Sequence, residues 1–529
     1  MRGRRFLILV ESPTKAKTLK SFLDREYDVK ATRGHVRDLP LRSLGVDLKT
    51  FSPRWVFLKG KKKLLEKIAS HKGFFLIATD PDREGERIAY DIWEFLRSKG
   101  KEAKRIEFHE ITPSAVKEAL SSPKDLNIMR VKSAVSRRVL DRLYGYLVSP
   151  VLWKEFGERG LSAGRVQSCA LKILVDRERE RKEFVPERWY EIELSLKKEG
   201  VIFKAKLWNI NEDIPERLSK EEAEFLERSL MGSSIRVLYL SAKEVSIPPH
   251  PPLKTATLLQ KASSTLGLSS GKVMREAQEL FERGYITYHR TDSCFLSERA
   301  IKMASRFIES EFGSDFLKIR RYPKTGAHEA IRPTNLDVRD ISPLYNLIWK
   351  YFLASQMSDV KIKKEKALFG WRNKVFLSSG EMVLFKGWSA VLERKKEPSL
   401  PPLFQGEEIK INEIHILKRQ SQPPSRYTEA SLVKELERKG VGRPSTYASI
   451  ISTLLRRGYV IKRKKSLIPT ELGFRVCEAL ERILGEKMLS PEFTSEMESR
   501  LDGIEHGIAE PEAFLRNFYR SLMLKVASE

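Results

Sequence analysis

The sequence predicts a multidomain fold that joins an N-terminal α/β domain to separate helical and β domains. The chain of 529 residues is several times longer than a domain of roughly 100 to 200 residues, so roughly two to five domains and more than one core are expected. Up to about residue 126, apolar runs typical of buried strands alternate with helical stretches. Beyond that point, helical segments and segments with period-two alternation follow one another in blocks, without a fixed-period repeat.

The N-terminal domain should contain three strands, each followed by a helix. We expect these strands and helices, in chain order, at 5–10, 13–27, 73–80, 87–100, 105–111 and 112–122. Ser12-Pro13 and Thr112-Pro113 supply a capping residue and a proline at the first helical position. Strands that alternate with helices form a parallel sheet with both faces covered.

The remainder of the chain divides into blocks of different character. From about 127 to 183 the pattern is helical and very basic, and residues 188–208 alternate as half-exposed antiparallel strands do. A proline-dense linker at 246–254 precedes helices up to about 365. Residues 375–392 are strand-like again, so an interrupted β domain receives two stretches. A second linker, 420–430, leads to a mostly helical tail.

Composition points to a polyanionic partner inside the cell. Lys and Arg number 98 against 71 Asp and Glu, a formal net charge of +27, and nucleic acid is the commonest partner of such a chain. A charge-rich surface of a heat-adapted protein is the alternative. The three cysteines form no C-x-x-C pair, which excludes a disulfide framework and a cysteine zinc site and suits a reducing cytoplasm. No apolar run approaches a signal sequence or a membrane span, so we expect no membrane contact.

The segment ATDPDREGE, residues 78–86, predicts a metal site at the end of the second strand. Asp80, Asp82 and Glu84 lie at i, i+2 and i+4, so continued strand geometry would point all three carboxylates one way. Converging carboxylates need a cation, and oxygen ligands select Mg²⁺. Glu11 ends the first strand and could join them. A loop-forming cluster is the alternative. A nucleotide triphosphatase is not expected, because G-x-x-x-x-G-K-[ST] is absent.

Three further segments have residues suited to phosphate contacts. RVKSAVSRRVLDRLYGY (130–146) carries arginines at helical spacing, while GLSAGRVQS (160–168) and GRPSTYASII (442–451) combine small residues with Arg, Gln, Ser or Thr. Small residues let a backbone approach a phosphate closely, and the polar side chains supply donors. A solvated basic helix beside a tight turn is the alternative. ITYHRTDS (286–293) places Tyr288 in a polar run, where simple packing is the alternative to chemistry.

Taken in order, ESPTKAK, GHVRDLP, ATDPDREGE, GLSAGRVQS, ITYHRTDS, HEAIRP and TEASLVKELERKGVGRPSTYASII resemble the signature segments of type IA DNA topoisomerases. The resemblance extends from Glu11 to about Tyr459. It implies that the α/β domain is a Toprim domain, which is Rossmann-like, and that helical and β domains complete a toroidal core. The implied activity is ATP-independent cleavage of one DNA strand, strand passage and religation, which relaxes negatively supercoiled DNA.

The resemblance also implies roles for individual residues. Tyr288 would attack a DNA phosphodiester and leave a 5′-phosphotyrosyl bond and a free 3′-hydroxyl. Exchange of one phosphodiester for another of similar energy needs no ATP. The roles of its neighbours are as follows: Arg290 and Lys15 hold the scissile phosphate, Glu11 protonates the leaving 3′-oxygen, Asp292 orients Arg290 or the tyrosine, and Asp80, Asp82, Glu84 and Glu11 hold Mg²⁺.

The partner implied by the resemblance is single-stranded or negatively supercoiled DNA, bound by a monomer. The expected DNA contacts are His35, Arg83, Arg105, Arg137, Arg138, Asp141, Arg142, Lys154, Ser162, Ala163, Gly164, Arg165, Val166, Gln167, Arg290, His328, Arg332 and Arg443.

On this reading the chain divides into six segments. They are 1–126, the Toprim domain, with 39–64 packing on the helical domain; 127–183 and 425–529, the two parts of a helical DNA-binding domain; 184–247 and 369–424, the two parts of a β gate or hinge domain; and 248–368, the helical domain with the tyrosine. Tyr288 and Glu84 thus lie in different domains, which must touch for cutting and separate for strand passage.

Other interpretations remain open at this stage. Many bacterial members have zinc ribbons with paired cysteines, which this sequence does not contain, so efficient or processive relaxation is in doubt. A DNA-binding architectural protein with an inactive site would share the basic charge, and a Toprim nuclease or primase would share the acids but would not need Tyr288. Service as the topoisomerase half of a reverse gyrase would need a helicase module that the chain does not contain.

Overall fold

The N-terminal domain is built on a parallel sheet, as the alternation of strands and helices predicts. The computed structural model describes residues 6–157, 159–395 and 397–527. The strand order is β2-β1-β5-β6, and every neighbouring pair is parallel. The elements of this domain are β1 Phe6–Val10, α1 Pro13–Lys20, β2 Tyr27–Ala31, β3 Arg37–Asp38, β4 Val56–Phe57, α2 Lys61–Ala69, β5 Phe74–Ile77, α3 Arg83–Ser98, β6 Ala103–Arg105 and α4 Pro113–Ser121.

Both faces of this sheet are covered, because consecutive residues of a strand point to opposite sides. Leu7 and Leu9 belong to the apolar core that includes residues of α2 and α3, whereas Ile8 and Val10 belong to the core that includes residues of α1. The expected capping residue Ser12 accepts a hydrogen bond from the Lys15 amide, at 3.1 Å, and Pro13 follows it at the first helical position.

Two sequence-based expectations for this domain are wrong in their bounds. The first helix ends at Lys20 instead of continuing to Tyr27, and Tyr27–Ala31 forms a strand that the sequence pattern did not reveal. The third strand covers only Ala103–Arg105, and residues 106–111 are irregular. They leave the sheet because their backbone contacts the tyrosine-bearing domain, where the carbonyl of His109 accepts a hydrogen bond from the Tyr288 amide at 2.8 Å.

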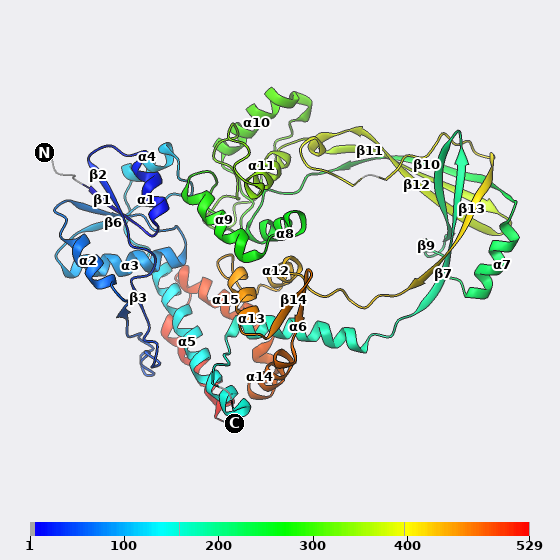
Figure 1. Cartoon of the computed structure of the whole chain (residues 1–529). Helices are drawn as coiled ribbons and strands as arrows, with labels where there is room; N and C mark the ends of the chain where they lie inside the picture. The colour runs from blue at the N-terminus through cyan, green and yellow to red at the C-terminus, as the bar shows by residue number, and fades with distance from the viewer. Residues whose placement is uncertain (1–5, 158, 396, 528–529) are drawn as a thin grey trace.

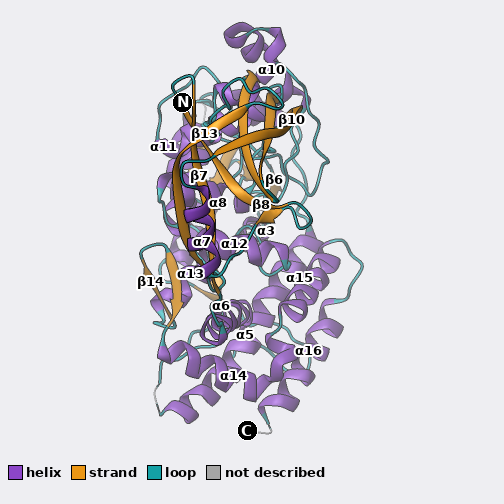
Figure 2. Cartoon of the chain, turned by 90° about the vertical axis from the view of Figure 1, so that its right-hand side faces the viewer, coloured by secondary structure: helices purple, strands orange, loops and turns teal. Residues whose placement is uncertain are grey.

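A helical body below the Toprim-like sheet is assembled from two distant stretches of chain. Its elements are α5 Ile128–Phe156, α6 Arg165–Glu183, α12 Glu429–Arg438, α13 Tyr447–Arg456, β14 Val460–Arg463, β15 Ser466–Pro469, α14 Glu471–Leu489, α15 Pro491–Glu505 and α16 Pro511–Val526. Helix α5 packs against α3, α15 and α16, and α6 packs against α13 and α14. Figure 2 shows α14 and α16 at the opposite end of the molecule from α10. Phe51 packs on Tyr519 with ring centroids 5.8 Å apart, which joins the segment 39–64 to this body.

The β domain is a seven-stranded antiparallel sheet of order β12-β11-β10-β13-β7-β8-β9, with an additional β12–β8 pairing that closes it on itself. Its elements are β7 Arg188–Lys198, β8 Val201–Asn209, β9 Ile214–Pro215, α7 Lys220–Leu230, β10 Ser234–Ile247, β11 Val360–Trp371, β12 Lys374–Phe385, η2 Gly387–Ala390 and β13 Glu408–Gln420. Strand β11 begins well before the stretch expected from 375, inside a region read as helical. Its lysines and apolar residues alternate in part with a period of two, which is the strand signal that the sequence analysis did not identify.

The tyrosine-bearing unit closes the molecule into a ring. Its elements are α8 Thr255–Leu266, α9 Ser270–Glu282, α10 Glu298–Phe312, η1 Ser314–Phe316 and α11 Pro343–Ser355. In Figure 1 the chain reaches the β domain along α6, crosses to the tyrosine-bearing helices by the long strand β10 and returns by β11. Helix α9 meets the Toprim-like domain on the other side, where it packs against α1. Among the described helices, none is long and apolar enough to cross a membrane.

Candidate active site

The phenol of Tyr288 lies against the acidic loop of the N-terminal domain. Its hydroxyl donates a hydrogen bond to Oδ2 of Asp82 at 2.7 Å, across 206 residues of sequence. The side chain is only 1% exposed, with its ring 5.1 Å from the rings of both Phe281 and His328. Burial and the charge of Asp82 raise the pKa of Tyr288 well above its usual value of 10. The phenol is therefore protonated at neutral pH, with a carboxylate in place to accept its proton.

Arg290 lies beside the phenol on the same loop. Its guanidinium is 3.4 Å from Oδ2 of Asp82 and 3.3 Å from Oε2 of Glu84. A cation at this position faces the oxygens of any phosphate that approaches the Tyr288 hydroxyl. Asp292, by contrast, is exposed, and no hydrogen bond joins it to Arg290 or to Tyr288 in the described residues. Its expected orienting role thus has no contact to support it in this structure.

The two innermost carboxyls of the site are held in opposite protonation states. Lys15, 1% exposed, donates to Asp80 at 3.0 Å, and Gln278 donates to the other oxygen at 3.3 Å. Burial alone would raise the pKa of Asp80, but the Lys15 ammonium outweighs it and lowers the value to about 2. Burial, followed by the neighbouring Asp80 charge, raises the pKa of Glu11 well above 4.5. Glu11 is thus a carboxylic acid beside a carboxylate.

The carboxylates of Asp82 and Glu84 converge by a different geometry from the one expected. Strand β5 ends at Ile77, so the spacing does not reflect a continued strand. Asp82 is instead the N-cap of α3 and accepts from the Gly85 amide at 2.8 Å. A Cβ at Gly85 would lie 2.0 Å from the Asp80 carbonyl oxygen, so this tight turn requires glycine.

Glu84 is half exposed and lies 3.0 Å from the ring nitrogen Nε2 of His35. The hydrogen bond from His35 is the main reason that the pKa of Glu84 falls to about 2. The carboxylate therefore stays ionised throughout the neutral range, with its charge facing both His35 and Arg290.

The chemistry of these side chains fits a hard divalent cation. All four acids offer oxygen donors, and the proton held by Glu11 beside the ionised Asp80 neutralises charge where a cation could do so. As they stand, Lys15, Tyr288 and Arg290 occupy the carboxylate oxygens, and no group of three or more His, Cys, Asp or Glu side chains in the described part of the chain is already arranged around a metal position. Binding would exchange those partners for the ion.

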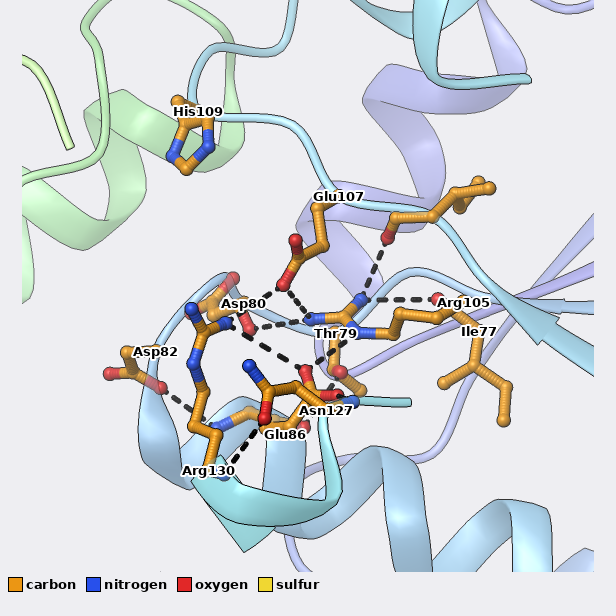
Figure 3. Close-up of polar contacts among 12 residues, drawn as sticks. Ile77, Thr79, Asp80, Asp82, Glu86, Arg105, Glu107, His109, Asn127 and Arg130 are labelled. Atoms are coloured by element: carbon orange, nitrogen blue, oxygen red, sulfur yellow. Dashed lines mark hydrogen bonds and ion pairs between the residues drawn. The ribbon is translucent and has the colours of Figure 1, made fainter. Parts of the chain in front are cut away.

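Three arginines expected to contact DNA are buried and paired with groups inside the protein. Arg105 is 1% exposed; its Nη2 donates to the carbonyl of Asp80 at 2.9 Å and its Nε to Glu86 at 3.0 Å (Figure 3). Arg165 is 1% exposed and donates to Glu498 at 2.6 Å, and Arg332 is 3% exposed. The expectation that these three bind DNA directly is corrected, because their guanidiniums hold internal carboxylates and carbonyls.

Arg105 instead holds the backbone of the acidic loop in place through hydrogen bonds. It also donates to the carbonyls of Ile77 and Ile106, at 3.1 and 2.7 Å, and Glu86 in turn accepts from the Asn127 amide at 2.7 Å. Figure 3 shows this network between the Asp80 turn and the start of α5. The side chains of Ala163 and Val166 are buried as well, and are not available to DNA.

The remaining expected DNA contacts lie at least partly at the surface. They are His35, Arg83, Arg137, Arg138, Asp141, Arg142, Lys154, Ser162, Gly164, Gln167, Arg290, His328 and Arg443. Sequence reasoning missed His109, whose Nδ1 lies 2.9 Å from Nδ1 of His328 across the domain contact. It also missed Glu110, which accepts from Arg332 at 2.9 Å across the same contact. The roles of His109 and Glu110 become visible only when the two domains are seen in contact.

A ring of domains with a tyrosine from one domain docked on the acids of another defines an enzyme that cuts and rejoins DNA, a type IA DNA topoisomerase. The model of the family described as DNA topoisomerase matches residues 125–516, and that of the Toprim domain matches residues 6–111. The chain therefore belongs to the bacterial type IA DNA topoisomerase family.

Individual relatives agree with this assignment. The chain is 41% identical over 522 residues to "DNA topoisomerase 1" of Aquifex aeolicus, covering 95% of each chain. It is 39% identical over 548 residues to "DNA topoisomerase 1" of Thermotoga maritima, covering 97% of this chain and 84% of that one. The solved structure of full-length topoisomerase I from Thermotoga maritima superimposes with a TM-score of 0.89, covering 98% of this chain and 90% of that one. The chain is thus an ATP-independent isomerase that cuts one strand through a 5′-phosphotyrosyl intermediate, passes a strand, reseals the break and relaxes negatively supercoiled DNA.

Proposed function

We propose that Tyr288 is the nucleophile of this enzyme and that Asp82 accepts its proton. The observation that carries the proposal is the 2.7 Å hydrogen bond from the buried phenol to Asp82. Because the pKa of Tyr288 is raised, the hydroxyl cannot ionise unaided at neutral pH. A carboxylate at hydrogen-bonding distance supplies the required base.

In the cleavage step, the Tyr288 oxygen bonds to the phosphorus of the scissile phosphodiester and its proton passes to Asp82. The bond from phosphorus to the 3′-oxygen breaks, and that oxygen takes a proton from Glu11. The raised pKa of Glu11 supports this role, because the group still holds a proton at neutral pH. Religation reverses each transfer, with the 3′-hydroxyl as nucleophile and the tyrosine as leaving group.

Two cations are proposed to bind the scissile phosphate. Arg290 already faces the oxygens of Asp82 and Glu84, and a phosphate would compete with them for its guanidinium. Lys15 is buried on Asp80, within the same group of side chains. Both would stabilise the negative charge that builds on the phosphate oxygens.

Mg²⁺ is the proposed cofactor, held by Asp80, Asp82 and Glu84 with Glu11. When bound, the ion supplies positive charge that positions the cleaved ends for resealing. On this chain's side, the four acids provide oxygen ligands, and Arg105 holds the backbone of the loop that carries Asp80.

Single-stranded DNA is the proposed substrate segment, and the contact residues are the partly exposed ones named above. Net charge of +27 supports steep salt dependence, because each neutralised phosphate releases counterions. We propose that the protein works as a monomer in the cytoplasm, where its three free cysteines would remain reduced.

The test is an oligonucleotide cleavage assay with separate labels at the two ends. The polarity of a 5′-phosphotyrosyl bond predicts that only the 3′-end label remains with the protein after denaturation, and that peptide mapping places the adduct on Tyr288. A matched control, Tyr285→Phe, removes a nearby phenol from the same loop and should leave the adduct unchanged. An adduct that forms in Tyr288→Phe, or that carries the 5′-end label, would overturn the assignment.

A further inference from the structure

Two arginines proposed to contact DNA are already paired with carboxylates from the end of α15. Arg83, in the first turn of α3, contacts both Asp502 and Glu505. Arg443, in the segment before α13, contacts the second oxygen of Asp502. One carboxylate thus joins arginines that come from two different domains.

These pairs lie next to the chemistry. Arg83 is flanked in sequence by Asp82, which holds the Tyr288 hydroxyl, and by Glu84, which contacts Arg290. The side chains of Arg83 and Asp502 are 21% and 35% exposed, so a ligand can reach the arginine and the carboxylate can turn to solvent. When a DNA phosphate reaches this position, the two arginines are already oriented, but their guanidiniums are paired with Asp502 and Glu505.

A third acid on the same helix differs in this respect. The side chains of Glu498 and Arg165 are both fully buried and form an ion pair, and Arg137 lies 3.4 Å from the same oxygen of Glu498. The Arg165–Glu498 pair is buried inside the helical body, where a ligand does not reach it. At the end of α15, by contrast, the paired side chains are partly exposed, so exchange with a ligand is open to Asp502 and Glu505.

We propose that Asp502 and Glu505 are internal stand-ins for DNA phosphates that hold Arg83 and Arg443 in the DNA-free protein and are displaced when a strand binds. Carboxylate and phosphate oxygens bind a guanidinium in the same forked geometry, so one can replace the other. The arginines stay oriented beside the cleavage site, while the competition lowers the affinity for a strand and favours its release. This inference rests on the proposed DNA contacts of Arg83 and Arg443.

The experiment measures binding of a fluorescent single-stranded oligonucleotide to the full chain across a salt series. Asp502→Asn and Glu505→Gln keep the side-chain shape and remove the competing charge, and each should tighten binding about two- to fivefold, the range expected for partly exposed ion pairs. The gain should fade at high salt, because screening weakens the internal pair. The matched control is Glu496→Gln, which removes one charge from the same helix at an exposed pair with Arg500; it should change affinity by less than about twofold.

Unchanged or weaker binding by both variants, with a lower melting temperature, would mean that the carboxylates only brace the two domains, and would overturn the inference. Arg83→Gln and Arg443→Gln separate this from the function itself. If these two variants weaken binding while the α15 variants do not tighten it, the DNA contacts stand and the competition is wrong. If Arg83→Gln and Arg443→Gln both bind as well as the unaltered protein, the proposed contacts fail, and the inference fails with them.

Discussion

At the scale of single residues, the site depends on which groups hold protons. Tyr288 and Glu11 have raised pKa values and keep their protons, whereas Asp80 and Glu84, each with a pKa of about 2, are ionised. Glu11 therefore still holds the proton that the leaving oxygen needs, and the phenol keeps its own proton while it donates a hydrogen bond to Asp82. Such a division of pKa values among neighbouring acids is what acid–base catalysis requires.

Asp82 should show two separable roles. Asp82→Asn keeps an N-cap for α3 but removes the acceptor for the phenol proton, so cleavage should fall at least about tenfold while stability is little changed. Asp82→Ala loses the cap as well and should cost about 1 kcal/mol of stability more than Asp82→Asn. Oligonucleotide cleavage and thermal melting measure the two effects. Full cleavage activity in Asp82→Asn would contradict the proposed base.

Glu11 should destabilise the metal-free protein at neutral pH. Its folded-state pKa lies above the unfolded value, so its contribution to stability is fully present below about pH 4.5 and is lost as the pH rises through the raised value. Glu11→Gln cannot ionise and should melt at a higher temperature than the unaltered protein at pH 8 in EDTA. The difference in melting temperature between Glu11→Gln and the unaltered protein should shrink towards pH 4.5. Glu11→Gln should also lose DNA cleavage. A lower melting temperature at pH 8 would contradict the assigned ionisation.

At the scale of elements, the irregular segment after β6 forms the contact that the tyrosine loop must leave and rejoin. His109 pairs with His328, and Glu110 with Arg332, across this contact. Tight packing accompanies these polar pairs, since a Cβ at Gly284 would lie 2.3 Å from the carbonyl oxygen of Ile111. Contacts of this kind can break and re-form as units, as strand passage requires.

Acid should weaken this contact. Burial lowers the pKa of His109, and burial followed by the neighbouring His109 lowers that of His328 to about 3. The separated domains can take up protons that the closed contact cannot hold, so closure is favoured above about pH 6.5 and is lost progressively below it. Energy transfer between dyes on α2 and α10 should report a larger open population at pH 5.5 than at pH 8, and His109→Asn should reduce the difference. An open population that does not depend on pH would contradict the account.

Local signals in the sequence predicted the elements that local physics determines. Strand β1 and the cap formed by Ser12 and Pro13 follow from apolar runs and capping chemistry. Strand β2 was missed because Tyr27–Ala31 includes charged residues and adopts the strand conformation by pairing with β1. The roles of Arg105, Arg165 and Arg332 were misjudged for a similar reason: an arginine motif looks alike whether its carboxylate partners are internal or its phosphates external. The candidate acids and Tyr288 were found because their residue types and spacing indicate the chemistry directly, as does the resemblance. Neither signal depends on knowing which side chains are buried.

At the scale of the whole molecule, the ring explains why cutting and strand passage are separate events. The tyrosine-bearing unit touches the Toprim domain through the site and reaches the β domain through β10 and β11 (Figure 1). Cleavage needs the first contact closed, and passage needs it open. The long paired strands are the natural place for the bending, because they are the only described connections on that side.

A covalent link across the closed contact should therefore stop relaxation without stopping cleavage. Arg299 donates to the Ser114 hydroxyl at 2.8 Å, so Ser114→Cys with Arg299→Cys places two thiols across it. A short thiol-reversible linker should abolish plasmid relaxation, leave oligonucleotide cleavage within about twofold, and release full activity on reduction. Each single variant, treated alike, is the control. Undiminished relaxation by the linked protein would show that strands pass elsewhere.

The most direct test of the central claim, that Tyr288 exchanges phosphodiester bonds beside the Toprim acids, uses negatively supercoiled plasmid with Mg²⁺ and without ATP. The unaltered protein should convert the plasmid stepwise to relaxed forms, and Tyr288→Phe should leave it supercoiled while still binding single-stranded DNA. Relaxation by Tyr288→Phe at the rate of the unaltered protein would contradict the claim.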